Sequence, residues 1–148
     1  MGHALIRAAS EADWQIYHAI RRSVLWEERG RGGYDEARPE ERLHHHHPLL
    51  LTFNGQGCGT TRLDDLRDGT GIVRGVAISA ILRGQGHGRI LNAMVEEYAR
   101  KLGIGTLFVN AAADAEGFYA ATGWDRVESH PLLEHADNCV PMRKAIVR

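Results

Sequence analysis

The sequence Arg83-Gly84-Gln85-Gly86-His87-Gly88-Arg89 decides the fold, because it joins two segments whose apolar residues repeat with different periods. The preceding segment, residues 72–78, is apolar and β-branched, which is typical of a central strand, and Arg74 and Gly75 interrupt it with a local break. The following segment repeats its apolar residues at helical spacing over residues 87–102, and Gly103 ends the pattern. We therefore predict a strand, a tight glycine turn and a helix in direct succession.

Such a turn is suited to bind a phosphate group. Glycines let a ligand approach the main chain closely, and the first N–H groups of a helix are unpaired donors at the positive end of its dipole. Arg83 and Arg89 flank the turn and can add charge-assisted hydrogen bonds. The sequence therefore predicts a pyrophosphate-binding turn, although the glycines alone are equally compatible with a purely structural connection.

Two better-known glycine signatures do not fit. The turn of ATP- and GTP-hydrolysing proteins ends in Gly-Lys-Ser/Thr, whereas Gly88-Arg89-Ile90 has neither the lysine nor the hydroxyl. A dinucleotide-binding turn is followed about 20 residues later by an acidic side chain, and here that position falls among Leu107 to Asn110. Nucleotide hydrolysis and a nicotinamide cofactor are both disfavoured.

The remaining segments place this unit in an α/β fold. Before this unit we predict a strand at Leu5 and Ile6 and a helix over residues 11–28 capped by Ser10 and Asp13. An exposed connection over residues 30–48 follows, with a helical turn at Pro39 to Leu43. A hairpin of residues 49–53 and 58–63 then forms around Asn54-Gly55. After the unit we predict a strand at Thr106 to Val109, a helix at Asp114 to Ala121 and a strand at Val140 to Val147. This order predicts a single domain over residues 1–148, with a mixed, mostly antiparallel sheet flanked by helices.

Composition narrows the partners. The 148 residues carry a formal charge of -1, so no overall field favours nucleic acid or an anionic membrane surface. No apolar run approaches the roughly 20 residues needed to cross a bilayer. We expect a cytoplasmic protein with no nucleic-acid or membrane partner, whose exposed sheet edges are compatible with a homodimer.

Some side chains invite a functional interpretation that the pattern does not support. His44 to His47 are consecutive, so they lack the spacing that directs two rings at one metal, and we expect no metal site but an exposed loop or part of the rim of an acceptor site. Cys58 and Cys139 lack an activating motif, and we expect both to be strand residues.

Two motifs together resemble the GCN5-related N-acetyltransferase (GNAT) family. Its turn reads Gln/Arg-x-x-Gly-x-Gly/Ala after a splayed central strand, and residues 83–88 match every specified position. Many members then have an Asn on the next strand and a helix reading Ala-x-x-Phe-Tyr-x-x-x-Gly-Phe/Tyr/Trp. This chain has Asn110, followed by Ala115-Glu116-Gly117-Phe118-Tyr119-Ala120-Ala121-Thr122-Gly123-Trp124.

The resemblance implies an enzyme that transfers an acetyl group from acetyl-CoA to a primary amine of a small molecule, peptide or protein. It implies that the splayed strand pairs with the pantetheine arm, that the turn holds the pyrophosphate and that Asn110 borders the cofactor's far end. The implied cofactor-binding residues are Val76, Ala77, Ile78, Arg83, Gly84, Gln85, Gly86, His87, Gly88, Arg89, Asn110 and Tyr119. Tyr119 is also the implied catalytic acid that protonates the leaving thiolate, the alternative being a core aromatic beside Phe118 and Trp124.

Two questions stay open in the sequence. The group that deprotonates the incoming ammonium could be Asp64, Asp65, Glu27, Glu28, His18 or a member of the His44 to His47 run, and a solvated surface charge explains each carboxylate equally well. The activity also has alternatives, namely an acyl-CoA-binding module that senses without catalysis and an interaction domain with a structural glycine turn.

Overall fold

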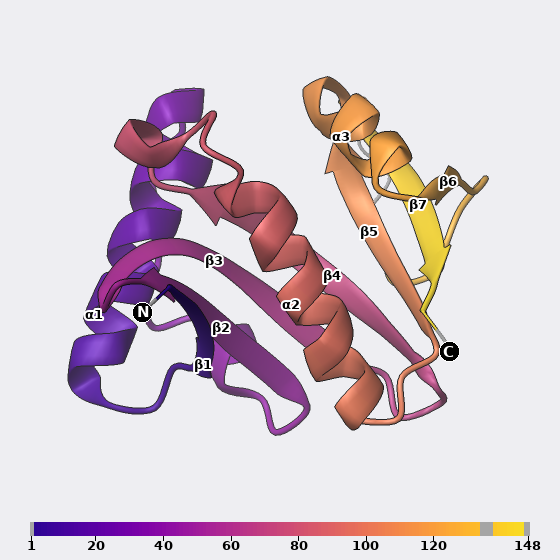
Figure 1. Ribbon diagram of the computed structural model, residues 1–148, viewed down its shortest axis with the longest axis horizontal. Helices are drawn as coiled ribbons and strands as arrows, with labels where there is room; N and C mark the ends of the chain where they lie inside the picture. Colours follow the sequence, from indigo (N-terminus) through magenta and orange to yellow (C-terminus); the bar gives the residue numbers. More distant parts are fainter. Residues whose placement is uncertain (1, 134–137, 147–148) are drawn as a thin grey trace.

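One twisted sheet organises the computed structural model, which describes residues 2–133 and 138–146 (Figure 1). Within these described ranges, seven strands lie in the order β1-β2-β3-β4-β5-β7-β6, and only β4 and β5 are parallel neighbours. The strands are β1 (His3–Arg7), β2 (His46–Phe53), β3 (Gln56–Asp65), β4 (Thr70–Ile78), β5 (Thr106–Ala112), β6 (Asp125–Arg126) and β7 (Cys139–Ala145). The predicted mixed, mostly antiparallel sheet is confirmed.

The hairpin of β2 and β3 forms around the predicted turn. Asn54 and Gly55 have positive φ angles of 51° and 85°, the backbone that a two-residue hairpin turn needs. The predicted exposed connection is wrong at its end, because β2 begins at His46 and His47 is buried. The reason is a tertiary contact, since His47 Nδ1 lies 2.7 Å from the Tyr98 hydroxyl of the opposite helix.

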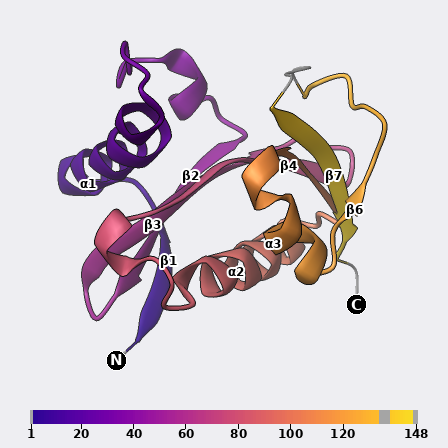
Figure 2. The same ribbon diagram turned by 90° about the horizontal axis from the view of Figure 1, so that it is seen from above.

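Helices cover both faces of the sheet (Figure 2). Helix α1 (Glu11–Arg21) lies on one face and α2 (His87–Lys101) on the other, and the short α3 (Glu116–Ala121) follows β5. Ser10 and Asp13 form the predicted capping box at the start of α1. The helical path then continues as a π-helical turn (Arg22–Trp26) and a 3-10 turn (Glu27–Arg29), so the predicted extent to residue 28 is confirmed.

The two faces have cores of different chemistry. The α2 face holds the larger apolar cluster, which includes Leu63, Leu91, Val95, Leu107 and Trp124. Leu102, the last residue of the predicted helical apolar pattern, is exposed, because it follows the last turn of α2. The α1 face has a smaller apolar cluster of Ile20, Leu50 and Ala77, beside a network of buried charges.

The sheet opens between β4 and β5. Thr70 to Val73 pair with Thr106 to Val109, and no further pairing joins these two strands over their described lengths. A bulge interrupts the register of β3 and β4 between Thr60 and Arg62, opposite Gly75, which has a φ angle of 63°. The strands separate toward their carboxyl ends, with the start of α2 above the gap (Figure 1). The predicted break in a splayed central strand is confirmed.

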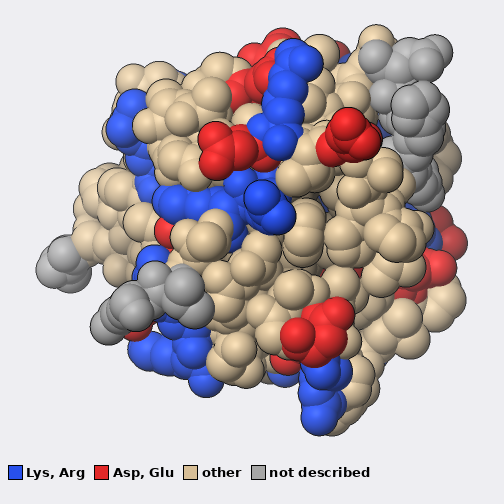
Figure 3. Space-filling model, turned by 90° about the vertical axis from the view of Figure 1, so that its right-hand side faces the viewer, with Lys and Arg blue, Asp and Glu red and all other residues tan. Residues whose placement is uncertain are grey.

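The C-terminal part completes the sheet beside this gap. A 3-10 turn (Ala113–Ala115) precedes α3, the predicted last strand begins at Cys139, and Val147 lies outside the described residues. The two-residue strand β6 was not predicted, because so short a segment has no periodicity. On the face of these strands, Lys and Arg lie beside Asp and Glu rather than in one continuous area (Figure 3). None of the helices described here has the length and apolar character to cross a membrane.

Candidate active site

The glycine turn connects β4 to α2. Gly84 and Gly86 have φ angles of 75° and 86°, and a Cβ added at either would meet no atom within 4 Å. Glycine is therefore required here by backbone conformation rather than by space. Within the described chain, no acceptor is hydrogen bonded to the backbone N–H groups of residues 84–89. The turn thus presents free donors at a helix N-terminus, which is the arrangement that binds phosphate.

Three cavities follow one another from this turn to the gap between β4 and β5. The turn cavity, of about 380 Å³, is lined by the glycine turn and Phe118. The middle cavity, of about 540 Å³, shares Ile78, Arg83, Gly88 and Phe118 with it. The tyrosine cavity, of about 310 Å³, shares Arg29, Val76 and Ala115 with the middle cavity and reaches Tyr119. Because neighbours share lining residues, the three cavities adjoin one another, and together they are called the path.

The free edge of β4 runs along this path. Ser79 N–H donates to the Cys58 carbonyl of β3 at 2.9 Å, so the alternation of a strand turns the peptide groups of Ile78 toward the gap. In agreement, the Ile78 carbonyl accepts a hydrogen bond from Arg83 Nε at 3.2 Å. Ala77 instead has Thr60 of β3 as its register partner and packs its side chain against Ile20 and Leu50.

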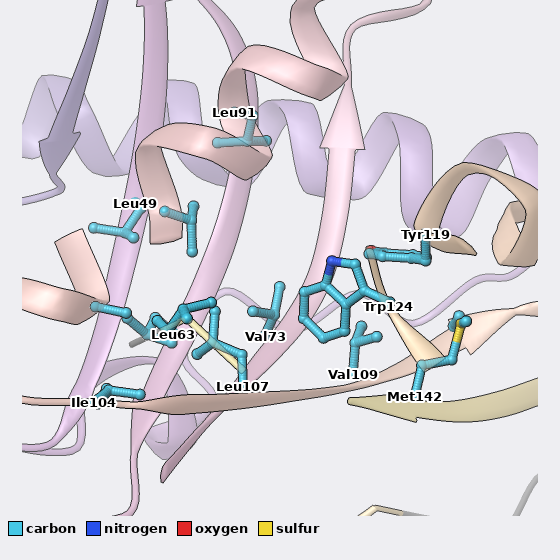
Figure 4. Packing of buried hydrophobic residues seen from close by; sticks show 14 of the residues in the cluster. Leu49, Leu63, Val73, Leu91, Ile104, Leu107, Val109, Tyr119, Trp124 and Met142 are labelled. Atoms are coloured by element: carbon cyan, nitrogen blue, oxygen red, sulfur yellow. The ribbon is translucent and has the colours of Figure 1, made fainter. Parts of the chain in front are cut away.

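Tyr119 lies at the far end of the path. Figure 4 shows its ring beside Trp124 in the hydrophobic core. Its ring packs nearly at right angles on Trp124 and Phe118, with centroid distances of 5.3 Å to each, and only 5% of the residue is exposed. Burial raises the pKa of the Tyr119 phenol to about 12, because desolvation penalises the phenolate. The side chain is thus both a core aromatic and a cavity-lining phenol that stays protonated at neutral pH.

Most of the predicted site residues line the path. Val76 and Ile78 line the middle of the path, Gly84, Gly86, Gly88 and Arg89 line the turn cavity, and Asn110 lines the tyrosine cavity. Gln85 is exposed, and its side chain donates to the Ile81 carbonyl at 3.4 Å. The His87 side chain is buried and shares a hydrogen bond with His3 of β1, 2.8 Å between Nδ1 and Nε2. The His87 ring therefore anchors α2 to β1.

Arg83 is engaged by an acidic residue of the helical segment that follows α1. Its guanidinium forms a two-pronged ion pair with Glu28, with distances of 2.6 Å from Nη1 to Oε1 and 2.9 Å from Nη2 to Oε2. The hydrogen bond from Arg83 lowers the pKa of Glu28, so the pair is charged on both sides at neutral pH. Glu28 and Arg83 both line the middle cavity. A ligand anion that binds there competes with Glu28 for the Arg83 guanidinium.

Most of the candidate bases lie away from Tyr119. Asp64 is not a solvated surface charge, because it is 3% exposed and accepts hydrogen bonds from Arg62 Nε at 2.7 Å and Arg74 Nε at 3.1 Å. The His18 ring is buried and bonds the Tyr34 hydroxyl at 2.6 Å. None of these residues lines the tyrosine cavity in the described structure.

The histidine run is divided by the start of β2. His46 lies 3.5 Å from Asp64 Oδ1, whereas His47 contacts Tyr98 on the other side of the sheet. Neither lines the tyrosine cavity, so the expected place on an acceptor rim is not observed. Over residues 2–133 and 138–146 there is no group of three or more His, Cys, Asp or Glu side chains that could hold a metal.

Sequence reasoning missed the arginines of the tyrosine cavity. Arg21, Arg29 and Arg31 line it together with Trp26 and Cys139. One signal was available, since Arg21 is the polar interruption in the otherwise apolar stripe of α1. Arg29 and Arg31 lie in a glycine-rich stretch whose path no periodicity specifies.

Comparisons with known proteins agree with this geometry. The family model described as an acetyltransferase (GNAT) domain matches residues 33–146. A Lactobacillus plantarum protein assigned as an N-acetyltransferase superposes with a TM-score of 0.82 at 25% identity, covering 99% of this chain and 100% of that chain. The ribosomal-protein-S18-alanine N-acetyltransferase of Escherichia coli gives 0.76 at 16% identity, covering 99% of this chain and 95% of that chain.

A third similar structure was determined with the coenzyme bound. N-acetylglutamate synthase from Neisseria gonorrhoeae, complexed with coenzyme A and N-acetyl-glutamate, gives a TM-score of 0.76 at 20% identity. The superposition covers 100% of this chain and 36% of that chain, so it compares one part of a larger protein. The family model matches most of this chain, and the glycine turn, the splayed strand and the buried tyrosine lie along one path. This chain therefore belongs to the GNAT acetyltransferase family.

Proposed function

We propose that the protein transfers the acetyl group of acetyl-CoA to the nitrogen of a primary amine. The observation that carries this proposal is the path from the glycine turn to Tyr119. Acetyl-CoA carries a diphosphate toward one end and a thioester at the other. It therefore needs an elongated site with free N–H donors near the diphosphate and a proton donor near the thioester.

Acetyl-CoA would occupy the path from the turn inward. Its pyrophosphate would bind the N–H groups of residues 84–89, with Arg83 and Arg89 as flanking cations. Its pantetheine arm would lie along Val76 and Ile78 and hydrogen bond the free edge of β4 as a neighbouring strand does. This placement puts the thioester at the tyrosine cavity, beside Asn110 and Tyr119.

The reaction at the tyrosine cavity is a direct attack of the amine on the thioester. A neutral amine adds to the thioester carbonyl, forming a C–N bond, and the C–S bond breaks as the tetrahedral intermediate collapses. A backbone N–H of β4 that faces the gap can stabilise the developing oxyanion. The Tyr119 phenol gives its proton to the leaving thiolate, and the proton released by the amine nitrogen restores the phenol through solvent. The products are the N-acetylated amine and free CoA thiol.

Cofactor binding and turnover are tested separately. Acetyl-CoA should raise the melting temperature of the protein, because a ligand that binds only the folded state stabilises it. Gly88→Val should abolish this shift, since Gly88 lines both the turn and middle cavities. Gly117→Val is the matched control, because Gly117 is also helical and has no neighbour within 4 Å of an added Cβ.

Turnover is measured as thiol release with a panel of amines. Release that depends on both acetyl-CoA and an amine supports the transferase. A clear thermal shift without thiol release for any amine would replace it with an acyl-CoA-sensing module. No shift with any CoA ester would leave the glycine turn with a structural role only.

A further inference from the structure

The tyrosine cavity contains a cluster of positive charge that acetyl transfer itself does not require. Its lining includes the guanidinium groups of Arg21, Arg29 and Arg31, and none of its described lining residues is Asp or Glu. The carboxylates nearest in the path, Glu28 and Asp114, line the middle cavity instead. Arg21 has an ion-pair partner outside the cavity, Glu41, whose Oε1 is also 3.6 Å from Arg62 Nη1. The lining itself is therefore more positive than the molecule as a whole, which is nearly neutral.

Arg21 is fixed at this cavity by the break in β4. Its Nη1 donates to the Gly75 carbonyl at 2.8 Å, and its guanidinium lies 5.1 Å from the centroid of the Tyr17 ring. The residue is 5% exposed, and its Nε is buried without a hydrogen-bond partner, 3.9 Å from Glu41 Oε1. A cation held in this way is costly unless an anion comes close.

Arg29 and Arg31 add exposed positive charge at the rim. Neither has an ion-pair partner within 4 Å among the described residues, although the charge of Arg29 contributes to lowering the pKa of Glu28. The Arg31 guanidinium stacks over the Trp26 ring at 4.3 Å from its centroid, and Arg31 N–H donates to the Trp26 carbonyl at 2.8 Å. Stacking orients the planar group while leaving its N–H edge free to bind an oxyanion in the forked geometry that arginine favours.

This arrangement selects among amines. An amine that carries no other charge approaches as an ammonium ion and is repelled by the three guanidinium groups, whereas an attached anion is attracted and can form charge-assisted hydrogen bonds. A volume of about 310 Å³ lies at the small end of ligand pockets, which suits a compact metabolite. The amine would then face Tyr119 and the anion would face the arginines.

We propose that the acceptor is a small primary amine that also carries a carboxylate or phosphate group, and that Arg21, Arg29 and Arg31 bind this anion. The proposal rests on the acetyl transfer proposed above and specifies its second substrate. Carboxylate and phosphate present the same oxyanion chemistry to arginine, so the assay contains both.

The test compares matched acceptors with acetyl-CoA held saturating. The panel pairs amino acids such as β-alanine with their amides, and 2-aminoethyl phosphate with 2-aminoethanol, and adds the dication of putrescine. At least one anionic member should exceed its partner without the anion by about 10-fold or more in kcat/KM, and putrescine should be the poorest. Which anionic pair responds distinguishes carboxylate from phosphate. Equal or better turnover of the amines without an anion would overturn the proposal and leave the transferase intact.

Variants tie the preference to the arginines. Arg29→Gln and Arg31→Gln should each raise KM for the anionic acceptor about 10-fold more than KM for its partner without the anion. Arg38→Gln is the control, because Arg38 lies in the same connection but pairs with Glu40 and does not line the cavity. An anion preference that survives the double variant Arg29→Gln/Arg31→Gln would contradict the proposed binding role.

Binding provides a readout that does not need turnover. Calorimetry should show the preferred anionic amine binding to the CoA complex of the wild-type protein and of Arg38→Gln, with affinity lost in the double variant. If the anionic members neither bind this complex nor release thiol while CoA itself still raises the melting temperature, the anion site is refuted and the coenzyme site stands. Absence of any response to CoA would refute the proposed function itself.

Discussion

Tyr119 combines a structural and a chemical position in one side chain. Its ring belongs to the apolar cluster with Trp124, and the residue also lines the tyrosine cavity beside Gly75 and Val76 of β4. Because burial raises the pKa of its phenol to about 12, the group enters the reaction with its proton. A thiolate leaving group forms next to an acid of this kind only if the coenzyme follows the whole path.

Removing the phenol should therefore affect turnover and spare binding. Tyr119→Phe keeps the ring that packs on Trp124 but has no proton to give, so kcat should fall by about 10²-fold, the range of a single acid catalyst. The dissociation constant of CoA, measured by calorimetry, should stay within about 2-fold. An unchanged kcat would exclude Tyr119 from proton transfer and leave it as a core residue.

Gly75 shows why the break in β4 needs glycine. Its φ angle is 63°, and an added Cβ would lie 2.8 Å from Arg21 Nη2 and 3.0 Å from Leu25 Cδ1. Gly75→Ala should therefore lower the free energy of unfolding by about 1–3 kcal/mol, from backbone strain and from the displaced Arg21. Gly69→Ala isolates the first term, because Gly69 has a φ angle of 88° and no neighbour within 4 Å of the added Cβ. Equal losses in urea unfolding of the two variants would show that the Arg21 contact contributes nothing.

At the scale of elements, the helical segment after α1 and the glycine turn are tied together by one ion pair. Glu28 belongs to the 3-10 turn that continues α1, and Arg83 lies in the connection from β4 to α2. The same guanidinium is a proposed ligand of the pyrophosphate, so Glu28 competes with the coenzyme. Above the unfolded pKa of Glu28, the carboxylate is ionised and the ion pair with Arg83 contributes fully to stability. This contribution is lost as the pH falls through the lowered pKa that Glu28 has in the folded state.

Freeing Arg83 should strengthen coenzyme binding. Glu28→Gln removes the competing charge, and the dissociation constant of CoA should fall about 3-fold at neutral pH. Glu27→Gln is the control, because it makes the same change on the neighbouring residue, which does not line the path. Weaker binding by Glu28→Gln would mean that Glu28 holds Arg83 in the position that the pyrophosphate needs.

At the scale of the whole molecule, the two faces of the sheet are stabilised differently. Apolar packing dominates below α2, whereas the α1 face contains Asp64 between Arg62 and Arg74. Asp64→Asn would remove the nearer counter-ion of the buried Arg62 and leave only Glu41 at 3.6 Å, so the free energy of unfolding should fall by roughly 3 kcal/mol. Asp125→Asn, on the exposed strand β6, should change it by less than about 0.5 kcal/mol in the same urea titration. An equally small loss of unfolding free energy for Asp64→Asn would show that water reaches the charges around Asp64.

The sequence specified those parts of the fold that depend on local signals. The hairpin follows from Asn54-Gly55, the start of α1 from Ser10 and Asp13, and the glycine turn from three closely spaced glycines. Tertiary contacts decided the rest, because His47 enters β2 through Tyr98 and Asp64 is buried by two arginines from neighbouring strand positions. The acceptor side depended on a glycine-rich segment without periodicity, so Arg29 and Arg31 could not be placed before the fold was known.

The position of bound CoA shows whether the coenzyme follows the path from the glycine turn to Tyr119. A crystal structure of the CoA complex should show pyrophosphate oxygens within about 3 Å of backbone N–H groups of residues 84–89, the distance of a hydrogen bond. It should also show the pantetheine arm along Val76 and Ile78, with the sulfur beside the Tyr119 hydroxyl. Pyrophosphate bound anywhere else, or a sulfur atom that does not reach the tyrosine cavity, would contradict the account.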